Sequence, residues 1–187
     1  MKKYELTSET KIVFGHILYR IKALSSFGCV SAGDLGGFLE SEKNLSQNGN
    51  AWVSGNAWVS GNAEVSGNAE GSGNAWVSGN AEVSGDARVS GNARVYGDAS
   101  VYGNAEVSEI GAIFWIGAIG SRNDTATFFR CRDGSIKVVC GCFFGNLDEF
   151  AKKVRKTHGD NDHAKVYMLA IDMAKIRIST EKEKTEE

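Results

Sequence analysis

The chain has 187 residues, 42% of them apolar, and a formal net charge of −2 at pH 7. This length suffices for one repeat body with small caps and excludes two large domains. The interspersed charges do not favour a nucleic-acid polymer as partner. No run of eighteen apolar residues and no apolar signal core occurs, so we expect no membrane association and a cytoplasmic location. In that compartment the cysteines, Cys29, Cys131, Cys140 and Cys142, should be reduced.

Residues 1–48 are expected to form an N-terminal β hairpin and cap. The segment 11–24, KIVFGHILYRIKAL, is rich in β-branched and aromatic residues, which predicts two strands joined by a turn at Gly15. The segment 27–45 contains Gly33, Gly36 and Gly37, and this cluster indicates tight bends. We interpret it as an irregular first coil, because the open end of the repeat that follows needs a cover.

Residues 49–109 contain a six-residue unit, Gly-Asn-Ala-X-Val-Ser, that runs ten times without an insertion over 49–108. Valine fills its position in every unit except one, where Gly71 stands. A period of six does not match the 3.6 residues of a helical turn, and β-branched Val with Gly-Asn disfavours helix. Such units bury their apolar face only by stacking, so the sequence predicts a solenoid of short strands broken by Gly-Asn or Gly-Asp turns.

This spacing of Val and Ala resembles the hexapeptide repeat of left-handed parallel β-helices. The resemblance implies triangular coils of three units with Val and Ala filling the interior. The expected fold class is mostly β: a left-handed parallel β-helix with an N-terminal β cap and a small C-terminal α+β domain. Hexapeptide acyltransferases present a histidine at the coil interface, but His16, His158 and His163 all lie outside the repeat. We therefore expect no enzyme, and acyl transfer is only a remote alternative.

Residues eighteen apart should lie above one another on the same face of such coils. One column of X positions carries Trp58, Trp76 and Arg94, and another alternates in charge at Glu70, Arg88 and Glu106. Two outward indoles form an apolar strip, which predicts a contact surface. The resemblance favours self-association, as a homotrimer. The alternative is that the N-terminal hairpin folds over the strip.

Residues 110–178 are expected to form the α+β domain. The run 110–120 should be a buried strand, with further strands over 125–131 and 135–140. Asn146 with Glu149 predicts the start of a helix that ends near residues 157–159. A second helix should run from about 162 to 176 and bury one face, formed by Val166, Leu169, Ala170, Met173 and Ile176. Residues 179–187 should be a disordered tail.

Two polar clusters are candidate binding sites. The first is the loop 121–125, in which Arg122, Asn123, Asp124 and Thr125 could bind a phosphate or a nucleobase edge. Its alternative is a tight turn that satisfies its own backbone. The second is 157–163, where His158 adjoins a helix start that could bind an anion. Its alternative is capping by Asp160 or Asn161. An aromatic ring such as Phe143, Phe128 or Trp115 would stack a base.

Cys140 and Cys142 with His158 and His163 could be assembled into a zinc set, but Cys-X-Cys lies outside the usual spacing of structural sites. Buried, inert cysteine is the favoured reading. We expect no metal and no cofactor.

The segments AGDLGGFLE, GNARV, IGSRNDTATFF, CGCF and THGDNDHAK together resemble a group of phage and prophage hexapeptide-repeat proteins. The likeness spans nearly the whole chain and implies action in a bacterial cytoplasm, without assigned catalytic residues. Two functions follow. One is a non-enzymatic sponge that sequesters a small phosphorylated nucleotide of bacterial immunity on an oligomeric β-helix. The other is a structural or interaction protein that uses the β-helix as a rigid spacer.

Overall fold

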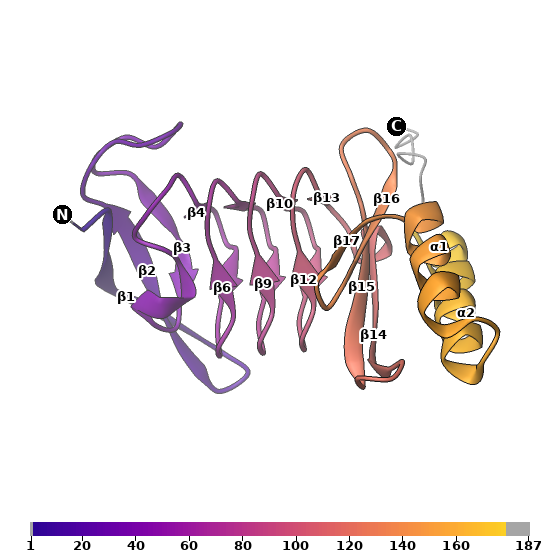
Figure 1. Cartoon of the computed structure of the whole chain (residues 1–187). Helices are drawn as coiled ribbons and strands as arrows, with labels where there is room; N and C mark the ends of the chain where they lie inside the picture. Colours follow the sequence, from indigo (N-terminus) through magenta and orange to yellow (C-terminus); the bar gives the residue numbers. More distant parts are fainter. Residues whose placement is uncertain (1, 179–187) are drawn as a thin grey trace, which may run out of the picture. The chain divides into compact units, whose positions relative to one another are not determined.

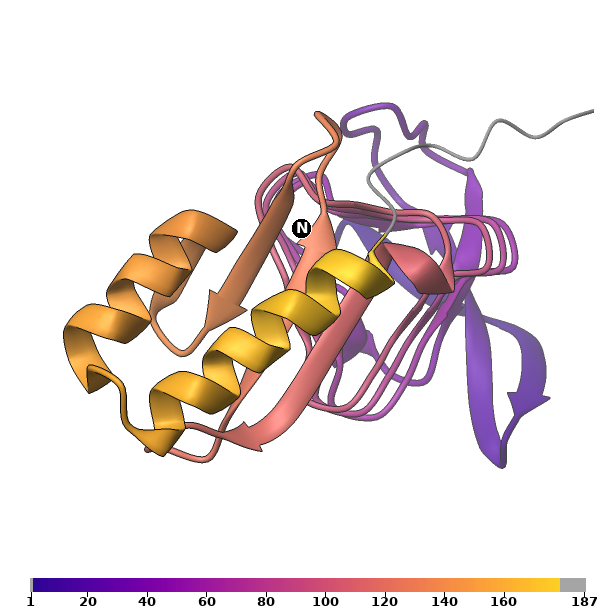
Figure 2. The ribbon, with the colours of Figure 1, turned by 90° about the vertical axis from the view of Figure 1, so that its right-hand side faces the viewer.

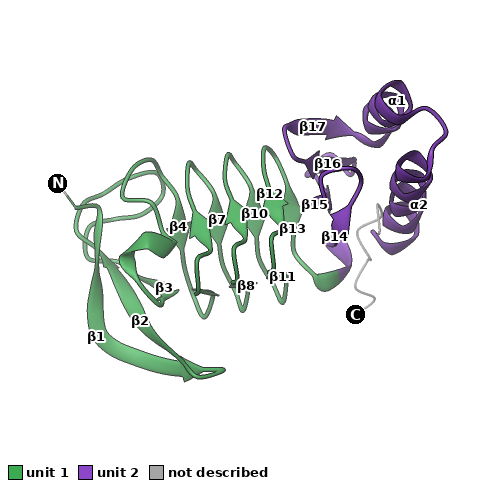
Figure 3. Ribbon diagram, turned by 60° about the horizontal axis from the view of Figure 1, so that its bottom comes forward, with its two compact units in different colours: residues 1–110 green, residues 111–187 purple. Residues whose placement is uncertain are grey.

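A computed structural model describes residues 2–178 of the chain (Figure 1). The chain divides into two compact units, residues 1–110 and 111–187 (Figure 3). The first unit joins the N-terminal cap and the whole repeat into one body, and the second is a small α+β unit. The predicted fold class, a parallel β-helix with a β cap and a C-terminal α+β part, is confirmed. The predicted tail 179–187 lies outside the described residues.

The cap is a long antiparallel hairpin followed by a third strand. Strands β1 (Tyr4–Val13) and β2 (His16–Ala23) pair around a turn at Phe14 and Gly15, and β2 pairs with β3 (Leu35–Leu39). The predicted hairpin is confirmed, but β1 begins earlier than the segment that predicted it. The reason is the buried ring of Tyr4, whose hydroxyl oxygen lies within hydrogen-bond distance of two carbonyl oxygens, that of Glu42 at 2.8 Å and that of Leu45 at 2.7 Å.

Gly36 and Gly37 do not form bends, so the prediction of tight bends is wrong at these two positions. Both lie inside β3, and their missing side chains let β3 approach the first units of the regular repeat. A Cβ at Gly36 would lie 2.6 Å from the carbonyl oxygen of Val53, and one at Gly37 would overlap the carbonyl oxygen of Ala57. Gly33, with φ of +96°, is a bend as predicted.

The repeat forms ten strands of two residues each, stacked in parallel (Figures 1 and 2). Three sheets run along the solenoid, and strands three units apart pair with a register of eighteen residues, as predicted. The repeat Val and Ala side chains are buried, which confirms the expected interior. The strands are β4 (Trp52–Val53), β5 (Trp58–Val59), β6 (Glu64–Val65), β7 (Glu70–Gly71), β8 (Trp76–Val77), β9 (Glu82–Val83), β10 (Arg88–Val89), β11 (Arg94–Val95), β12 (Ser100–Val101) and β13 (Glu106–Val107).

The first coil departs from this regularity. Phe38 of β3 pairs with Trp58, so the chain between them is two residues longer than between Trp58 and Trp76. The two extra residues lie between Leu45, which pairs with Val65, and Asn50, which already follows the register of eighteen. Before them the coil forms a short 3₁₀ helix, η1 (Glu42–Asn44). Asn44 is fully buried and donates to the carbonyl oxygens of Gly61 at 3.0 Å and Ala63 at 2.9 Å. The irregular coil is thus fastened to the regular ones through backbone acceptors.

Asparagine ladders connect successive coils at the turns, a feature that the sequence analysis missed. Asn50 Nδ2 donates to Asn68 Oδ1 at 3.1 Å, and Asn68 Nδ2 donates to Asp86 Oδ1 at 3.0 Å. A matching pair of bonds runs from Asn62 through Asn80 to Asp98. A carboxylate can accept but not donate, so Asp86 and Asp98 are acceptors in these two ladders.

The second unit contains one antiparallel sheet of four strands in the order β14-β15-β16-β17. The strands are β14 (Ile113–Ile119), which follows the 3₁₀ helix η2 (Ile110–Ala112), then β15 (Asp124–Arg130), β16 (Ile136–Cys140) and β17 (Phe143–Asn146). Strands β15 and β16 were predicted, and β17 was not. The prediction that 110–120 is buried is wrong in part. β14 lies at the sheet edge, where only Ile113 and Ile119 are buried within the strand.

Helices α1 (Leu147–His158) and α2 (Asp162–Arg177) pack on one face of this sheet (Figures 1 and 2). The predicted capping box is confirmed: Asn146 Oδ1 accepts from the Glu149 N–H at 2.9 Å, and the Glu149 carboxylate accepts from the Asn146 N–H. Within residues 2–178, no helix is long and apolar enough to cross a membrane.

The predicted buried face of α2 is wrong. The side chains that face the core are Ala164, Tyr167, Ala170, Ile171 and Ala174. Of the predicted face only Ala170 is buried, and four apolar side chains are exposed: Val166, Leu169, Met173 and Ile176. α2 carries two apolar stripes, and the one rich in alanine packs inward because small side chains let a helix approach its neighbours closely.

Candidate functional site

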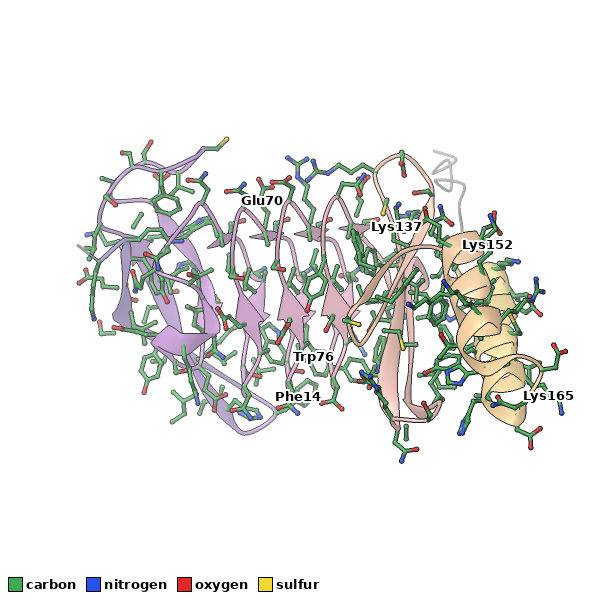
Figure 4. All side chains as sticks on the ribbon, viewed as in Figure 1. Phe14, Glu70, Trp76, Lys137, Lys152 and Lys165 are labelled. Atoms are coloured by element: carbon green, nitrogen blue, oxygen red, sulfur yellow. The ribbon has the colours of Figure 1, made fainter. Side chains whose placement is uncertain are left out.

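The tryptophan column on the solenoid is covered by the chain's own hairpin. The rings of Trp58 and Trp76 stack with centroids 4.9 Å apart, and the Arg94 guanidinium lies 5.4 Å from the Trp76 centroid. Phe14, at the hairpin tip, lies 5.3 Å from Trp76 and 6.3 Å from Trp58 (Figure 4 labels Phe14 and Trp76). The structure therefore follows the second alternative. Phe14 is itself 78% exposed and Arg94 is exposed beside Trp76, so the role of Trp58, Trp76 and Arg94 in self-association stays a prediction.

A cleft of about 330 Å³ in the second unit collects most of the candidate ligand-binding residues. Arg122, Asp124, Phe143 and His158 all line it. Ser121 and Thr157, from the two candidate clusters 121–125 and 157–163, line it as well. The sequence analysis did not place the other lining residues there, which are Cys140, Gly141, Cys142, Phe150, Lys153, Val154 and Tyr167. The role of these residues in binding stays a prediction.

The sheet topology explains why residues far apart in the sequence meet at this cleft. The turn from β14 to β15 and the turn from β16 to β17 lie at the same end of the antiparallel sheet. Gly141, with φ of +55°, belongs to the second turn, and a Cβ there would lie 3.2 Å from Asp124 Oδ2. The absence of a side chain at Gly141 thus gives the Asp124 carboxylate its room. The helices contribute Lys153, Thr157 and His158 from α1, and Tyr167 from α2.

Asn123 and Thr125 do not line the cleft. Asn123 adopts a left-handed conformation, with φ of +51°, which closes the tight turn that begins at Gly120. The Thr125 N–H donates to Asp124 Oδ1 at 2.8 Å. For these two residues the structure follows the alternative of a self-satisfying turn, because the backbone N–H groups of both donate to acceptors within the loop.

Aromatic rings form one wall of the cleft. Phe143 and Phe150 lie with centroids 5.1 Å apart, and Phe150 meets Tyr167 edge-to-face at 5.5 Å. His158 stacks on Tyr167 at 5.9 Å, so its ring is held against this wall. The neighbouring polar segment caps α2, as its alternative predicted: Asn161 Oδ1 accepts from the Ala164 N–H at 3.1 Å. Only His158 and Thr157 of that segment line the cleft.

Tyr167 and Cys140 form a protonated pair in the cleft. The Cys140 Sγ lies 3.8 Å from the Tyr167 hydroxyl oxygen. Burial, reinforced by Cys140, raises the pKa of Tyr167 to about 12, and burial also raises the pKa of Cys140. A thiol with a raised pKa stays uncharged at neutral pH and is a poor nucleophile. This supports the interpretation of Cys140 as inert. Cys142 is exposed, so the expectation of a buried cysteine is wrong at that position.

The charged side chains of the cleft are mostly cationic. Arg122 comes from the turn before β15, and Lys153 lies one helical turn before Thr157 on α1. Asp124 is the carboxylate that opposes them. Tyr167 and Lys153 were missed because Tyr167 lies on the α2 face that was expected to be exposed, and a lysine on a helix resembles a solvated charge. Among residues 2–178, no group of three or more His, Cys, Asp or Glu side chains could hold a metal ion.

Comparison with known proteins bears on the solenoid. The family model of the YdcK beta-solenoid repeat matches residues 81–97 and 87–103. These residues contain β9 to β12. No curated protein matches the chain. Over this part of the repeat the chain is similar to the YdcK β-solenoid, in agreement with the stacked parallel coils of the first unit.

Proposed function

We propose that the protein is a non-enzymatic binding protein that sequesters a small phosphorylated nucleotide in the cleft of its second unit. The observation that carries this proposal is the composition of the cleft. It holds Arg122, Lys153 and His158 around an aromatic wall that includes Phe143. The cations Arg122 and Lys153 beside a flat apolar surface suit a ligand made of phosphate and a heterocyclic base. The cleft volume, about 330 Å³, lies at the lower end of the range of small-molecule sites.

Each charged residue has a distinct role in this proposal. The Arg122 guanidinium offers a planar fork of donors to two phosphate oxygens, and Lys153 adds a point charge. Phe143 provides an apolar ring for the base. Asp124 is a hydrogen-bond acceptor for an exocyclic amino group of a base. A carboxylate beside the cations also disfavours ligands that are phosphate alone.

Binding without turnover is the version that the local chemistry supports. The Cys140 thiol is held protonated beside Tyr167, and the His158 ring stacks on Tyr167. Repeat residues 49–108 contain no histidine of the kind that acyl transfer would need. A stable scaffold that presents a binding cleft fits sequestration, in which the ligand is released intact. For a phage protein the ligand would be a nucleotide second messenger of bacterial immunity, bound in the host cytoplasm.

The test is uptake and release. The full chain is incubated with cyclic and linear nucleotides of one to three units, separated from free ligand, then heated, and the released material is analysed by chromatography. Intact ligand released on denaturation supports the proposal. Chemically altered ligand indicates an enzyme instead, and no uptake by the folded protein overturns the proposal.

Two arginine variants make this test specific to the cleft. Arg122→Ala should weaken uptake about tenfold or more, because a charge-assisted hydrogen bond in a cleft contributes about 1.5–3 kcal/mol. Arg132→Ala is the matched control, since Arg132 lies in the turn between β15 and β16, at the opposite end of β15. Equal uptake by both variants would show that the site is elsewhere.

A structural or interaction role is the second candidate, and the build of the solenoid favours it. Ladders of asparagine bond successive coils, and Arg88 Nε lies 3.2 Å from Glu70 Oε2 across one coil step. Such a body is a suitable rigid spacer. The homotrimer that the hexapeptide resemblance implies belongs to this proposal also, and its interface would have to include the hairpin that covers Trp58. Two results together would favour this candidate: the purified chain sediments as a defined oligomer, and it takes up no nucleotide.

A further inference from the structure

Helix α2 presents a second apolar stripe away from the core of its own unit. The stripe consists of Val166, Leu169, Met173 and Ile176, which we call the outer stripe. These side chains are 39%, 63%, 49% and 87% exposed. The inward side of the same helix is fully occupied by contacts with the sheet and α1. A surface helix normally has one apolar face, so a second one indicates a binding surface.

The spacing of the outer stripe identifies the kind of partner. Its residues follow one another at intervals of three, four and three, which is the a-d-a-d pattern of a coiled-coil seam. Val166 and Met173 take the a positions, and Leu169 and Ile176 take the d positions. Such a seam accepts another helix whose side chains follow the same spacing. The helix at hand with this property is α2 itself, in a second copy of the chain.

The charges beside the outer stripe select the orientation. Asp172 precedes an a residue and occupies a g position, and Arg177 follows a d residue and occupies the next e position. In a parallel pair, a g residue faces the e residue five positions later on the partner helix. Asp172 of each copy would then meet Arg177 of the other. In an antiparallel pair, g positions face g positions, which would bring the Asp172 carboxylates of the two copies together.

We propose that the α2 helices of two copies of this chain pair in parallel through the outer stripe, with Asp172 of one copy facing Arg177 of the other. Each seam residue then meets its own equivalent in the partner. The seam is short, with four apolar residues on each side, so it buries less than a stable permanent interface does. The association should accordingly be reversible and depend on protein concentration.

A position-specific cross-link tests the parallel seam. The exposed cysteines are first removed by Cys29→Ser and Cys142→Ser, which leaves the buried Cys131 and the half-buried Cys140. In that background Leu169→Cys should give a covalently linked pair of chains on mild oxidation, because equal d positions meet in a parallel pair. Lys175→Cys is the matched control, exposed on the same helix but outside the outer stripe. No linked pair with Leu169→Cys, or equal linkage with Lys175→Cys, overturns the proposal.

A charge swap tests the orientation independently, by sedimentation equilibrium of the full chain. Asp172→Arg places two arginines together in each contact and should raise the dissociation constant about threefold to tenfold. The double variant Asp172→Arg with Arg177→Asp restores opposite charges and should return the constant to within about twofold of the parent. If the double variant associates as weakly as the single one, the parallel pairing is overturned.

The result is separable from ligand binding, because the outer stripe shares no residue with the cleft. Leu169→Glu should weaken association at least tenfold while its far-ultraviolet circular dichroism matches that of the parent. If this well-folded variant associates as strongly as the parent, the outer stripe is not the interface and the proposal fails.

Discussion

The carboxylate of Glu40 joins the hairpin to the solenoid through His16, whose Nδ1 lies 2.9 Å from Glu40 Oε1. The other carboxylate oxygen accepts a hydrogen bond from the Gly61 N–H at 2.6 Å. Both contacts favour the charged carboxylate. The hydrogen bond with His16, followed by that from Gly61, holds the pKa of Glu40 below its ordinary value of 4.5. The attachment of the hairpin to the first coil therefore depends on pH.

Glu40→Gln should lower the free energy of unfolding at pH 7 by about 1 kcal/mol, the net worth of a partly exposed hydrogen bond to a charged group. The pKa is lower in the folded than in the unfolded protein. The carboxylate thus stabilises the fold above its unfolded pKa, and this contribution is lost as the pH falls through the folded pKa. Urea unfolding of variant and parent at pH 7 and at about pH 3 should show a difference that shrinks with acid.

Glu42→Gln is the control for this experiment, because Glu42 forms an exposed ion pair with Lys2 at 2.7 Å. Exposed pairs contribute little, so its cost should be within about 0.5 kcal/mol of zero. A cost for Glu40→Gln that is the same at both pH values would contradict the assignment of the stabilisation to the charged carboxylate.

Gly71 leaves a small void in the solenoid interior, at the one repeat position without Val. The void measures about 10 Å³, and Val53, Val65 and Val89 are among its lining residues. Gly71 is not left-handed, and a Cβ there would meet Val53 Cγ2 at 3.6 Å, an ordinary contact. Gly71→Ala should therefore raise the free energy of unfolding by about 1 kcal/mol, through added apolar contact and a less flexible unfolded chain.

Gly67→Ala should lower the free energy of unfolding, in contrast to Gly71→Ala, when both variants are unfolded with urea. Gly67 has φ of +68°, and a Cβ there would lie 3.1 Å from the Gly85 nitrogen one coil away. This variant should lose at least about 1 kcal/mol from the strained conformation alone. If Gly71→Ala destabilises as much as Gly67→Ala does, the interior has no room at Gly71.

Much of the first unit was predictable because the period of its sequence determines how its side chains pack. A Val every six residues determines which side chains point inward, and the register of eighteen places Trp58 beneath Trp76 and Glu70 beneath Arg88. The sequence did not show whether the tryptophans are covered, because the residues around Phe14 do not indicate against which surface the hairpin tip packs. The asparagine ladders were overlooked because Gly-Asn was interpreted only as turn chemistry.

The second unit was harder to predict, because the packing of its helices and the position of its cleft depend on contacts between distant segments. Both stripes of α2 are apolar in sequence, and only packing shows that Ala164 and Ala174 face inward rather than Leu169. In the cleft, the polar types at Arg122 and Asp124 suggested binding, and the sheet topology brings them to Phe143 and His158. Asn123 and Thr125, from the same loop, lie outside the cleft because of the geometry of the turn.

The ladder through Asn80 should respond differently to two substitutions. Asn80 accepts from Asn62 Nδ2 at 3.1 Å and donates to Asp98 Oδ1 at 2.9 Å. Asn80→Ala removes both exposed hydrogen bonds and should cost about 1 kcal/mol in the free energy of unfolding. Asn80→Asp keeps the acceptor but places a carboxylate against that of Asp98, so it should cost more at pH 7. Urea unfolding should show the cost of Asn80→Asp falling below that of Asn80→Ala at about pH 3, where the carboxylates are protonated.

Gly120 is required where β14 turns toward β15, beside the cleft. Its φ is +71°, and a Cβ there would overlap the hydroxyl and ring of Tyr167. Gly120→Ala must therefore strain the turn and displace Tyr167 from Cys140, at a cost of about 2 kcal/mol or more in the free energy of unfolding. Gly117→Ala is the control, because a Cβ at this exposed glycine would meet only Thr125 Oγ1, at 3.4 Å. Thermal unfolding should separate the two variants. If Gly120→Ala unfolded at the same temperature as Gly117→Ala, the close approach of Tyr167 to this turn would be contradicted. The position of the ring against which His158 stacks would then be wrong as well.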